Sequence, residues 1–207
     1  MKRRISAIML ALMVMTGSQA VFAEDAVSSA TVDISSVPTI QESGETTMLV
    51  IYFSTNDTVK AVALNAADAI GADVFEIVPE EPYTEEDLAY YTDGRCDKEQ
   101  ADDTARPGIA EWPESLEQYD IIFIGYPIWH GQAPKILYTL LEGIDVSGKT
   151  IVPFCTSMSS GAGSSADNLA RFTDDTTTWL QATRMENQIT ADQVQEWAVS
   201  ALEEAVE

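Results

Sequence analysis

The stretch DIIFIGYPIWHGQAP, residues 120–134, decides the fold class of this chain. It contains a continuous apolar run, Ile121 to Ile124, which has the length of a strand and the composition of one buried on both faces of a sheet. A Trp and the only His of the chain then follow between two prolines. In parallel sheets, ligands bind outside the carboxyl ends of the strands. The stretch therefore predicts a buried strand that leads directly into a binding loop.

Apolar runs and helical patterns alternate on both sides of this stretch. Further strands are expected in MLVIYFS (48–54), ADVFEIVP (72–79), TIVPFCTS (150–157) and within TTTWLQATRM (176–185). Helical periodicity predicts a helix after the first strand that stops at Gly71, helices over about 133–141 and 164–172, and a last helix capped by Thr190. This alternation is typical of an α/β protein with a parallel sheet, and right-handed crossovers place helices on both of its faces.

The first 23 residues have the pattern of a secretory signal peptide. Three basic residues, Lys2 to Arg4, precede an apolar segment, and small residues lead to Ala23, after which cleavage is expected. The apolar segment is shorter than the roughly 20 residues that span a membrane, so we expect export without membrane insertion, an uncleaved anchor being the alternative. Residues 24–47 are predicted to be a flexible linker and residues 48–207 a single domain.

Composition excludes some partners. The chain has 34 acidic and 11 basic residues, and loss of the signal would leave 8 basic residues and a net charge of −26. Such a charge repels nucleic acid and anionic lipid; it is read as a solvated surface, with an acidic docking face as the alternative. The two cysteines, Cys96 and Cys155, are expected to be free thiols, although an oxidising compartment would permit a disulfide.

Three polar loops follow expected strands: STNDTV (54–59), PIWHG (127–131) and TSMSSGAG (156–163). The first leads into a helix N-terminus, where backbone N–H groups favour a phosphate, although the same residues are explained as a helix cap. The second offers a flat ring for stacking, and the third offers Ser hydroxyls and Gly backbone. A single His without Cys, Asp or Glu residues nearby does not have the spacing of a metal site. A catalytic pair, with Cys155 as nucleophile and His130 as base, is a minor alternative. Together the loops predict a site for a phosphorylated aromatic cofactor.

These motifs, in this order from Met48 to Phe172, resemble the flavodoxin-like family of FMN-binding proteins, and residues 81–91 and 105–107 resemble an insertion found in one of its groups. The resemblance implies a doubly wound five-stranded sheet of order 2-1-3-4-5. It also implies FMN as the cofactor, with Trp129 covering one face of the isoalloxazine and His130 near its edge. The implied binding residues are Ser54, Thr55, Asn56, Asp57, Thr58, Val59, Pro127, Ile128, Trp129, His130, Gly131, Thr156, Ser157, Met158, Gly161 and Gly163.

Five positions depart from the family pattern. Asn56 stands where a Thr is common, and His130 replaces what is often a second Trp. Asp57 and Met158 stand where relatives often have Gly, and Val59 stands where a Thr is common. A carboxylate about 4 Å from a phosphate costs on the order of 1 to 4 kcal/mol, which Lys60 would offset if it curled back.

We expect an FMN redox protein, either an electron carrier or an NAD(P)H- or quinone-dependent reductase, with an unidentified redox partner or small-molecule acceptor. The alternative is a flavin-free binding module that keeps the fold.

Overall fold

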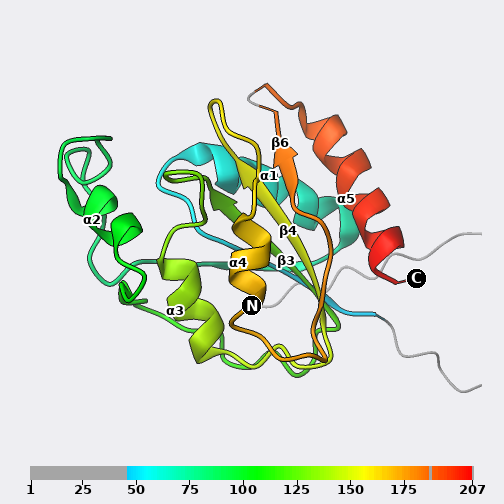
Figure 1. Cartoon of the computed structure of the whole chain (residues 1–207). Coiled ribbons are helices and arrows are strands. Elements are labelled where there is room, and N and C mark those ends of the chain that lie inside the picture. The colour runs from blue at the N-terminus through cyan, green and yellow to red at the C-terminus, as the bar shows by residue number, and fades with distance from the viewer. Residues whose placement is uncertain (1–45, 187, 207) are drawn as a thin grey trace, which may run out of the picture. The chain divides into compact units, whose positions relative to one another are not determined.

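A parallel sheet forms the centre of the domain (Figure 1). The computed structural model describes residues 46–186 and 188–206. The expected signal peptide lies outside this part, as does the expected linker except for its last two residues. The strands follow the order β2-β1-β3-β4-β5, which confirms the expected topology. Their bounds are β1 (Met48–Tyr52), β2 (Asp73–Glu76), β3 (Ile121–Pro127), β4 (Thr150–Thr156), β5 (Thr178–Trp179) and β6 (Thr183–Met185).

Helices cover both faces of the sheet, as predicted. Helices α1 (Asp57–Ile70) and α5 (Ala191–Ala205) pack side by side on one face. Helices α3 (Ile136–Gly143) and α4 (Ser165–Ala170) cover the other (Figure 1). A further short helix, α2 (Arg95–Ala101), which the sequence did not predict, lies in the long connection between β2 and β3. None of the helices in the described part of the chain is long and apolar enough to cross a membrane.

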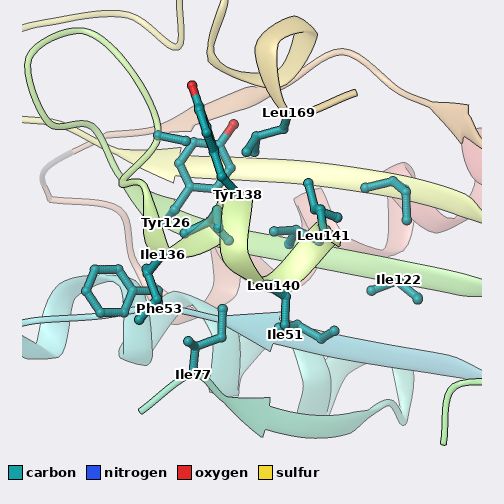
Figure 2. Close-up of a cluster of buried hydrophobic side chains, with 14 of the residues drawn as sticks. Ile51, Phe53, Ile77, Ile122, Tyr126, Ile136, Tyr138, Leu140, Leu141 and Leu169 are labelled. Carbon is teal, nitrogen blue, oxygen red and sulfur yellow. The ribbon is translucent and has the colours of Figure 1, made fainter. Parts of the chain in front are cut away.

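The central strand β3 has side chains buried on both faces. Ile122, Ile124 and Tyr126 belong to the core on the α3 side, whereas Ile121 and Phe123 belong to the core on the α1 side. Figure 2 shows the α3-side cluster, in which helix residues point toward side chains of the strands; the labelled members are Ile51, Phe53, Ile77, Ile122, Tyr126, Ile136, Tyr138, Leu140, Leu141 and Leu169. Because successive side chains of a strand point to opposite faces of the sheet, β3 contributes residues to two separate cores.

Two of the predicted helix ends are found in detail. Gly71 ends α1 in a left-handed conformation, with φ of 69°. Thr190 begins α5 with a capping box, in which its hydroxyl and the Gln193 side chain each accept a hydrogen bond from the other residue's backbone N–H. Cys96 and Cys155 are both free thiols, as expected, and both are buried.

The fifth strand differs from the prediction because it is split into two pieces. Strand β5 pairs with the start of β4 and β6 with its end, and both pairings are parallel. The register advances by one residue between them, from Ile151 opposite Trp179 to Phe154 opposite Thr183. Pro153 lies in β4 beside this break, and a proline has no N–H to donate to a ladder. The extra residue and the missing donor explain why the pairing is interrupted.

Candidate functional site

Three loops meet at the carboxyl ends of β1, β3 and β4, as the sequence predicted. They are the β1–α1 loop (residues 53–56), the β3–α3 loop (residues 128–135) and the β4–α4 loop (residues 157–164). The Phe53 N–H donates to the Gly125 carbonyl at 2.9 Å, and the Ile128 N–H donates to the Thr156 carbonyl at 2.9 Å. These bonds between neighbouring strand ends bring the three predicted segments to one edge of the sheet.

The β1–α1 loop presents the N-terminus of α1. Asn56 is the N-cap, and its side-chain oxygen accepts a hydrogen bond from the Thr58 N–H at 3.0 Å. The Ser54 hydroxyl donates to the Asn56 carbonyl. Asp57 and Thr58 are exposed in the first turn, Thr55 is half-buried, and the Val59 side chain is 1% exposed and packs in the core on the α1 side. Thr58 is therefore the last residue of this turn that offers a polar side chain to the loop, because Val59 points into the core.

Lys60 does not turn back to this loop. Its ammonium lies 3.0 Å from the Glu76 carboxylate, which also accepts a hydrogen bond from the Tyr52 hydroxyl at 2.8 Å. Both Lys60 and Glu76 are partly exposed, so the pair itself adds little stability. The pair nevertheless engages Lys60, the cation that was expected to compensate for the Asp57 carboxylate.

The Asn56 cap gives a first test of the local structure. We expect Asn56→Ala to lower the free energy of unfolding by about 1 kcal/mol, because an N–H of the first turn loses its acceptor. Urea denaturation followed by circular dichroism measures this loss. Asn65→Ala, in the middle of the same helix, is the control and is expected to be neutral or slightly stabilising, because alanine is the better helix former. Equal effects of the two substitutions would contradict the cap.

The β3–α3 loop folds Trp129 inward. The Trp129 side chain is 5% exposed, and its ring packs edge-on against Phe53 at 5.5 Å and Tyr83 at 5.2 Å between centroids. Trp129 and Gln132 exchange two backbone hydrogen bonds of 2.9 Å, which makes the loop a tight turn. In this structure the Trp129 ring belongs to the core, so its stacking on a flavin stays a prediction.

His130 lies at the tip of the same loop and is exposed. Its backbone is left-handed, with φ of 48°, and Gly131 follows with φ of 79°. The His130 Nε2 is 2.8 Å from the Asp97 carboxylate, and the His130 ring lies 4.7 Å from the Tyr90 ring. Although partial burial opposes it, hydrogen bonds from backbone N–H groups and from His130 hold the pKa of Asp97 below its usual value. Asp97 is thus ionised at neutral pH and orients the imidazole.

The β4–α4 loop is the most open of the three. The Ser157 hydroxyl accepts a hydrogen bond from the Ser160 N–H at 3.0 Å, and Met158 is 91% exposed. A Cβ added at Gly163 would lie 3.8 Å from the Gly131 carbonyl oxygen, which places the two loop tips next to each other. Thr156 is buried as the last residue of β4, and Gly161 is exposed.

The comparisons with known proteins identify the family of this fold. The family model described as Flavodoxin matches residues 47–201, most of the chain. The chain belongs to the flavodoxin family. A search of the curated proteins found no match.

Solved structures of similar proteins include candidate flavoproteins from two Bacteroides species. The one from Bacteroides eggerthii is 34% identical over 76% of this chain and 99% of its own, with a TM-score of 0.69. The one from Bacteroides uniformis is also 34% identical, over 73% of this chain and 97% of its own, with a TM-score of 0.68. A flavoprotein from Lactobacillus acidophilus in complex with FMN is 18% identical over 79% of this chain and 100% of its own; its TM-score of 0.55 shows a shared fold.

Sequence reasoning missed several residues that contact the loops of this flavodoxin-family domain. Arg184 donates from its guanidinium to the Ser157 carbonyl at 3.1 Å, and it reaches the loop from β6. The others, which lie in the connection between β2 and β3, are Tyr83, Tyr90, Asp97 and Gln100. The only signal for them was the length and aromatic content of that connection. No group of three His, Cys, Asp or Glu side chains within residues 46–186 and 188–206 could hold a metal ion.

The groups at this edge fit a phosphorylated aromatic ligand. The exposed first turn of α1 offers backbone N–H groups and the Thr58 hydroxyl to a phosphate. The exposed backbone at His130, Gly131 and Gly161 offers polar groups to a ring edge. The Asp57 carboxylate, which is exposed in the same turn, is the one group in this set that repels a phosphate.

Proposed function

We propose that this flavodoxin-family domain binds FMN noncovalently and cycles it between its oxidised and reduced forms. The observation that carries the proposal is the meeting of the β1–α1, β3–α3 and β4–α4 loops around the capped N-terminus of α1. The flavoprotein from Lactobacillus acidophilus, which shares the fold, was solved in complex with FMN. When bound, the flavin supplies the redox chemistry.

The residues of the chain bind and orient the cofactor. The first turn of α1, with the Thr55 and Thr58 hydroxyls, holds the phosphate by N–H donors and the helix dipole. The β3–α3 and β4–α4 loops hold the ring from two sides. Trp129 excludes water from the face or the side of the flavin ring. His130, held by Asp97, donates or accepts a hydrogen bond at the edge of that ring. The many surrounding carboxylates disfavour an added negative charge on the flavin and lower its potential.

Within this proposal the domain is either an electron carrier or a reductase of quinone-type acceptors. We further propose that it works outside the cytoplasm, which the signal-like residues 1–23 support and which favours a donor other than cytosolic NAD(P)H. A mature N-terminus at Glu24 in protein from the culture would support export, and an intact Met1 would contradict it. NADH oxidation with quinone acceptors separates the reductase from the carrier.

A second candidate function is a flavin-free binding module with the same fold. Two observations favour it: Asp57 lies in the first turn of α1, and Lys60 is paired with Glu76 and does not turn back to the β1–α1 loop. A visible absorption spectrum and an FMN titration of the purified protein decide between the two. Flavin bands and a micromolar or tighter Kd are expected from the redox protein. A colourless protein that binds no FMN would support the flavin-free binding module.

Replacing Asp57 tests the phosphate position directly. We expect Asp57→Asn to tighten FMN binding by roughly fivefold to tenfold, because a negative charge near the phosphate is removed. The same substitution is expected to lower the stability of the protein slightly, because α1 loses an acid from its first turn. Isothermal titration measures the Kd for FMN and for riboflavin, which lacks the phosphate.

The control for Asp57 is Asp68→Asn, an exposed acid late in the same helix. We expect Asp68→Asn to leave the Kd for FMN unchanged and Asp57→Asn to leave the Kd for riboflavin unchanged. Equal gains for the two flavins, or equal gains from the two substitutions, would place the phosphate away from α1.

A further inference from the structure

The connection between β2 and β3 contacts the β3–α3 loop along most of its length. We call residues 80–110 of this connection the insertion; Figure 1 shows α2 and its flanking loops beside α3. The Tyr90 hydroxyl donates to the Ile128 carbonyl at 3.3 Å, and Asp97 holds the His130 ring at 2.8 Å. The loop that would bind the ring of the flavin is therefore held from outside by a segment distant in sequence.

Gln100 of α2 makes the most extensive of these contacts. Its amide nitrogen donates to the Trp129 carbonyl at 3.0 Å and to the Ala133 carbonyl at 3.2 Å. Its amide oxygen accepts from the Lys135 N–H at 3.2 Å. One side chain thus uses both N–H groups and its oxygen on three backbone groups, which lie on both sides of the turn between Trp129 and Gln132.

The packing of α2 directs Gln100 toward the loop. Cys96, one turn earlier on the same face of the helix, is 1% exposed, and Asp97, three residues before Gln100, is bound to His130. The opposite side of α2 carries Lys98, whose side chain is 65% exposed. The far end of the loop has a further tie, since the Lys135 ammonium, with its side chain 4% exposed, lies 2.9 Å from the Asp103 carboxylate.

The loop needs such support because its backbone conformation is unfavourable. His130 adopts a left-handed conformation, which costs an L-residue roughly 1 to 2 kcal/mol. The carbonyls of Trp129 and Ala133 flank this tip, and a buried carbonyl without a donor destabilises a loop further. The Trp129 carbonyl already accepts from the Gln132 N–H, so the Gln100 amide adds a second donor there, supplies a donor to the Ala133 carbonyl, and fixes the distance between the two carbonyls.

We infer that Gln100 is a positioning residue, which holds the β3–α3 loop in the conformation that receives the flavin. The inference rests on the proposed function for its link to FMN. Its structural part, the fixing of the loop, does not depend on flavin. Gln100 itself is not expected to contact the cofactor, because its side-chain amide already makes three hydrogen bonds to the backbone of the loop.

The test compares Gln100→Met, which keeps the length of the side chain without its hydrogen bonds, with the parent protein. Amide hydrogen exchange of the flavin-free protein is read by mass spectrometry on peptides that cover residues 128–135. We expect exchange in this loop to be about tenfold faster or more in the variant, while peptides of α5 keep their rates. Gln195→Met, the same chemical change on α5, is the control and is expected to leave the loop unchanged.

The second readout is flavin binding by the same proteins. We expect Gln100→Met to weaken FMN binding about tenfold and, at saturating FMN, to move the midpoint potential toward that of free FMN, because a looser loop admits water to the ring. Gln100→Glu keeps the acceptor for Lys135 but turns a second carboxylate oxygen toward the two carbonyls. It is expected to weaken binding more than Gln100→Met does.

The outcomes separate this inference from the proposed function. Unchanged exchange in the loop of Gln100→Met would overturn the inference, even if the parent protein binds FMN. Faster exchange with an unchanged Kd and an unchanged potential would overturn the positioning role. A parent protein that binds no FMN, with faster exchange in the variant, would refute the proposed function while supporting the fixing of the loop by Gln100.

Discussion

Trp129→Ala is expected to lower the free energy of unfolding by about 3 to 5 kcal/mol, the usual cost of emptying a buried Trp site. The ring is 5% exposed and contacts Phe53 at the end of β1 and Tyr83 of the insertion. Its removal would leave a cavity where three parts of the chain meet, and the rigid end of β3 leaves little room for collapse. Equilibrium denaturation in urea, followed by far-UV circular dichroism, measures the loss.

Trp129→Phe is the matched variant, because it keeps an aromatic ring in contact with Phe53 and Tyr83. We expect it to cost less than half as much as Trp129→Ala. A cost below about 1 kcal/mol for Trp129→Ala would mean that the ring is not part of the core in solution. The ring would then be free to cover a flavin face, as the family resemblance implies. The stability of this variant therefore tests the predicted stacking role before any flavin is added.

Gly125→Ala is expected to destabilise the domain by about 3 kcal/mol, at the upper end of the range for overpacking a core. A Cβ at Gly125 would lie 2.2 Å from the nearest atom of the Phe154 ring. Phe154 lies opposite Gly125 on β4, is fully buried and packs edge-on against Trp197 at 5.4 Å, so its ring would have to shift within the core to make room. Thermal and urea denaturation both report the effect.

A double-mutant cycle separates the clash from any general loss of strand flexibility. Phe154→Leu alone should cost stability, since it leaves a cavity beside Trp197. The pair Gly125→Ala with Phe154→Leu is expected to cost less than the sum of the two single changes, because the smaller side chain makes room for the new methyl group. Additive costs would show that the Phe154 ring is not what requires glycine at this position.

The order of elements could be read from the sequence because each element carries a strong local signal. The continuous apolar run at Ile121 to Ile124 requires burial on both faces, and Gly71 and Thr190 are residues whose own chemistry ends or begins a helix. The meeting of the three loops then follows from the parallel sheet, since all carboxyl ends lie at one edge. Helix α3 begins at Ile136, three residues later than predicted, because Pro134 disfavours a helical conformation at Ala133 and residues 133–135 still belong to the β3–α3 loop.

The contacts that the sequence did not reveal all depend on tertiary partners. The inward position of Trp129 depends on Phe53 and on Tyr83, which is 46 positions earlier in the chain. Gln100 has no local signal that would direct its amide to a loop more than 25 residues away. Helix α2 is short and polar, so its stability depends on tertiary packing, such as that of the buried Cys96, and not on a local sequence signal. The break in the fifth strand depends on its pairing with β4 and cannot be seen in either strand alone.

The split of the fifth strand also bears on how the protein behaves at high concentration. A sheet edge becomes a template for another molecule when it offers a long run of unpaired backbone groups. Here that edge consists of two residues in β5 and three in β6, with a shift of register between them. A strand arriving from a second molecule could follow one piece but would be out of step with the other. The interruption therefore disfavours the pairing of a second molecule at this edge of the sheet.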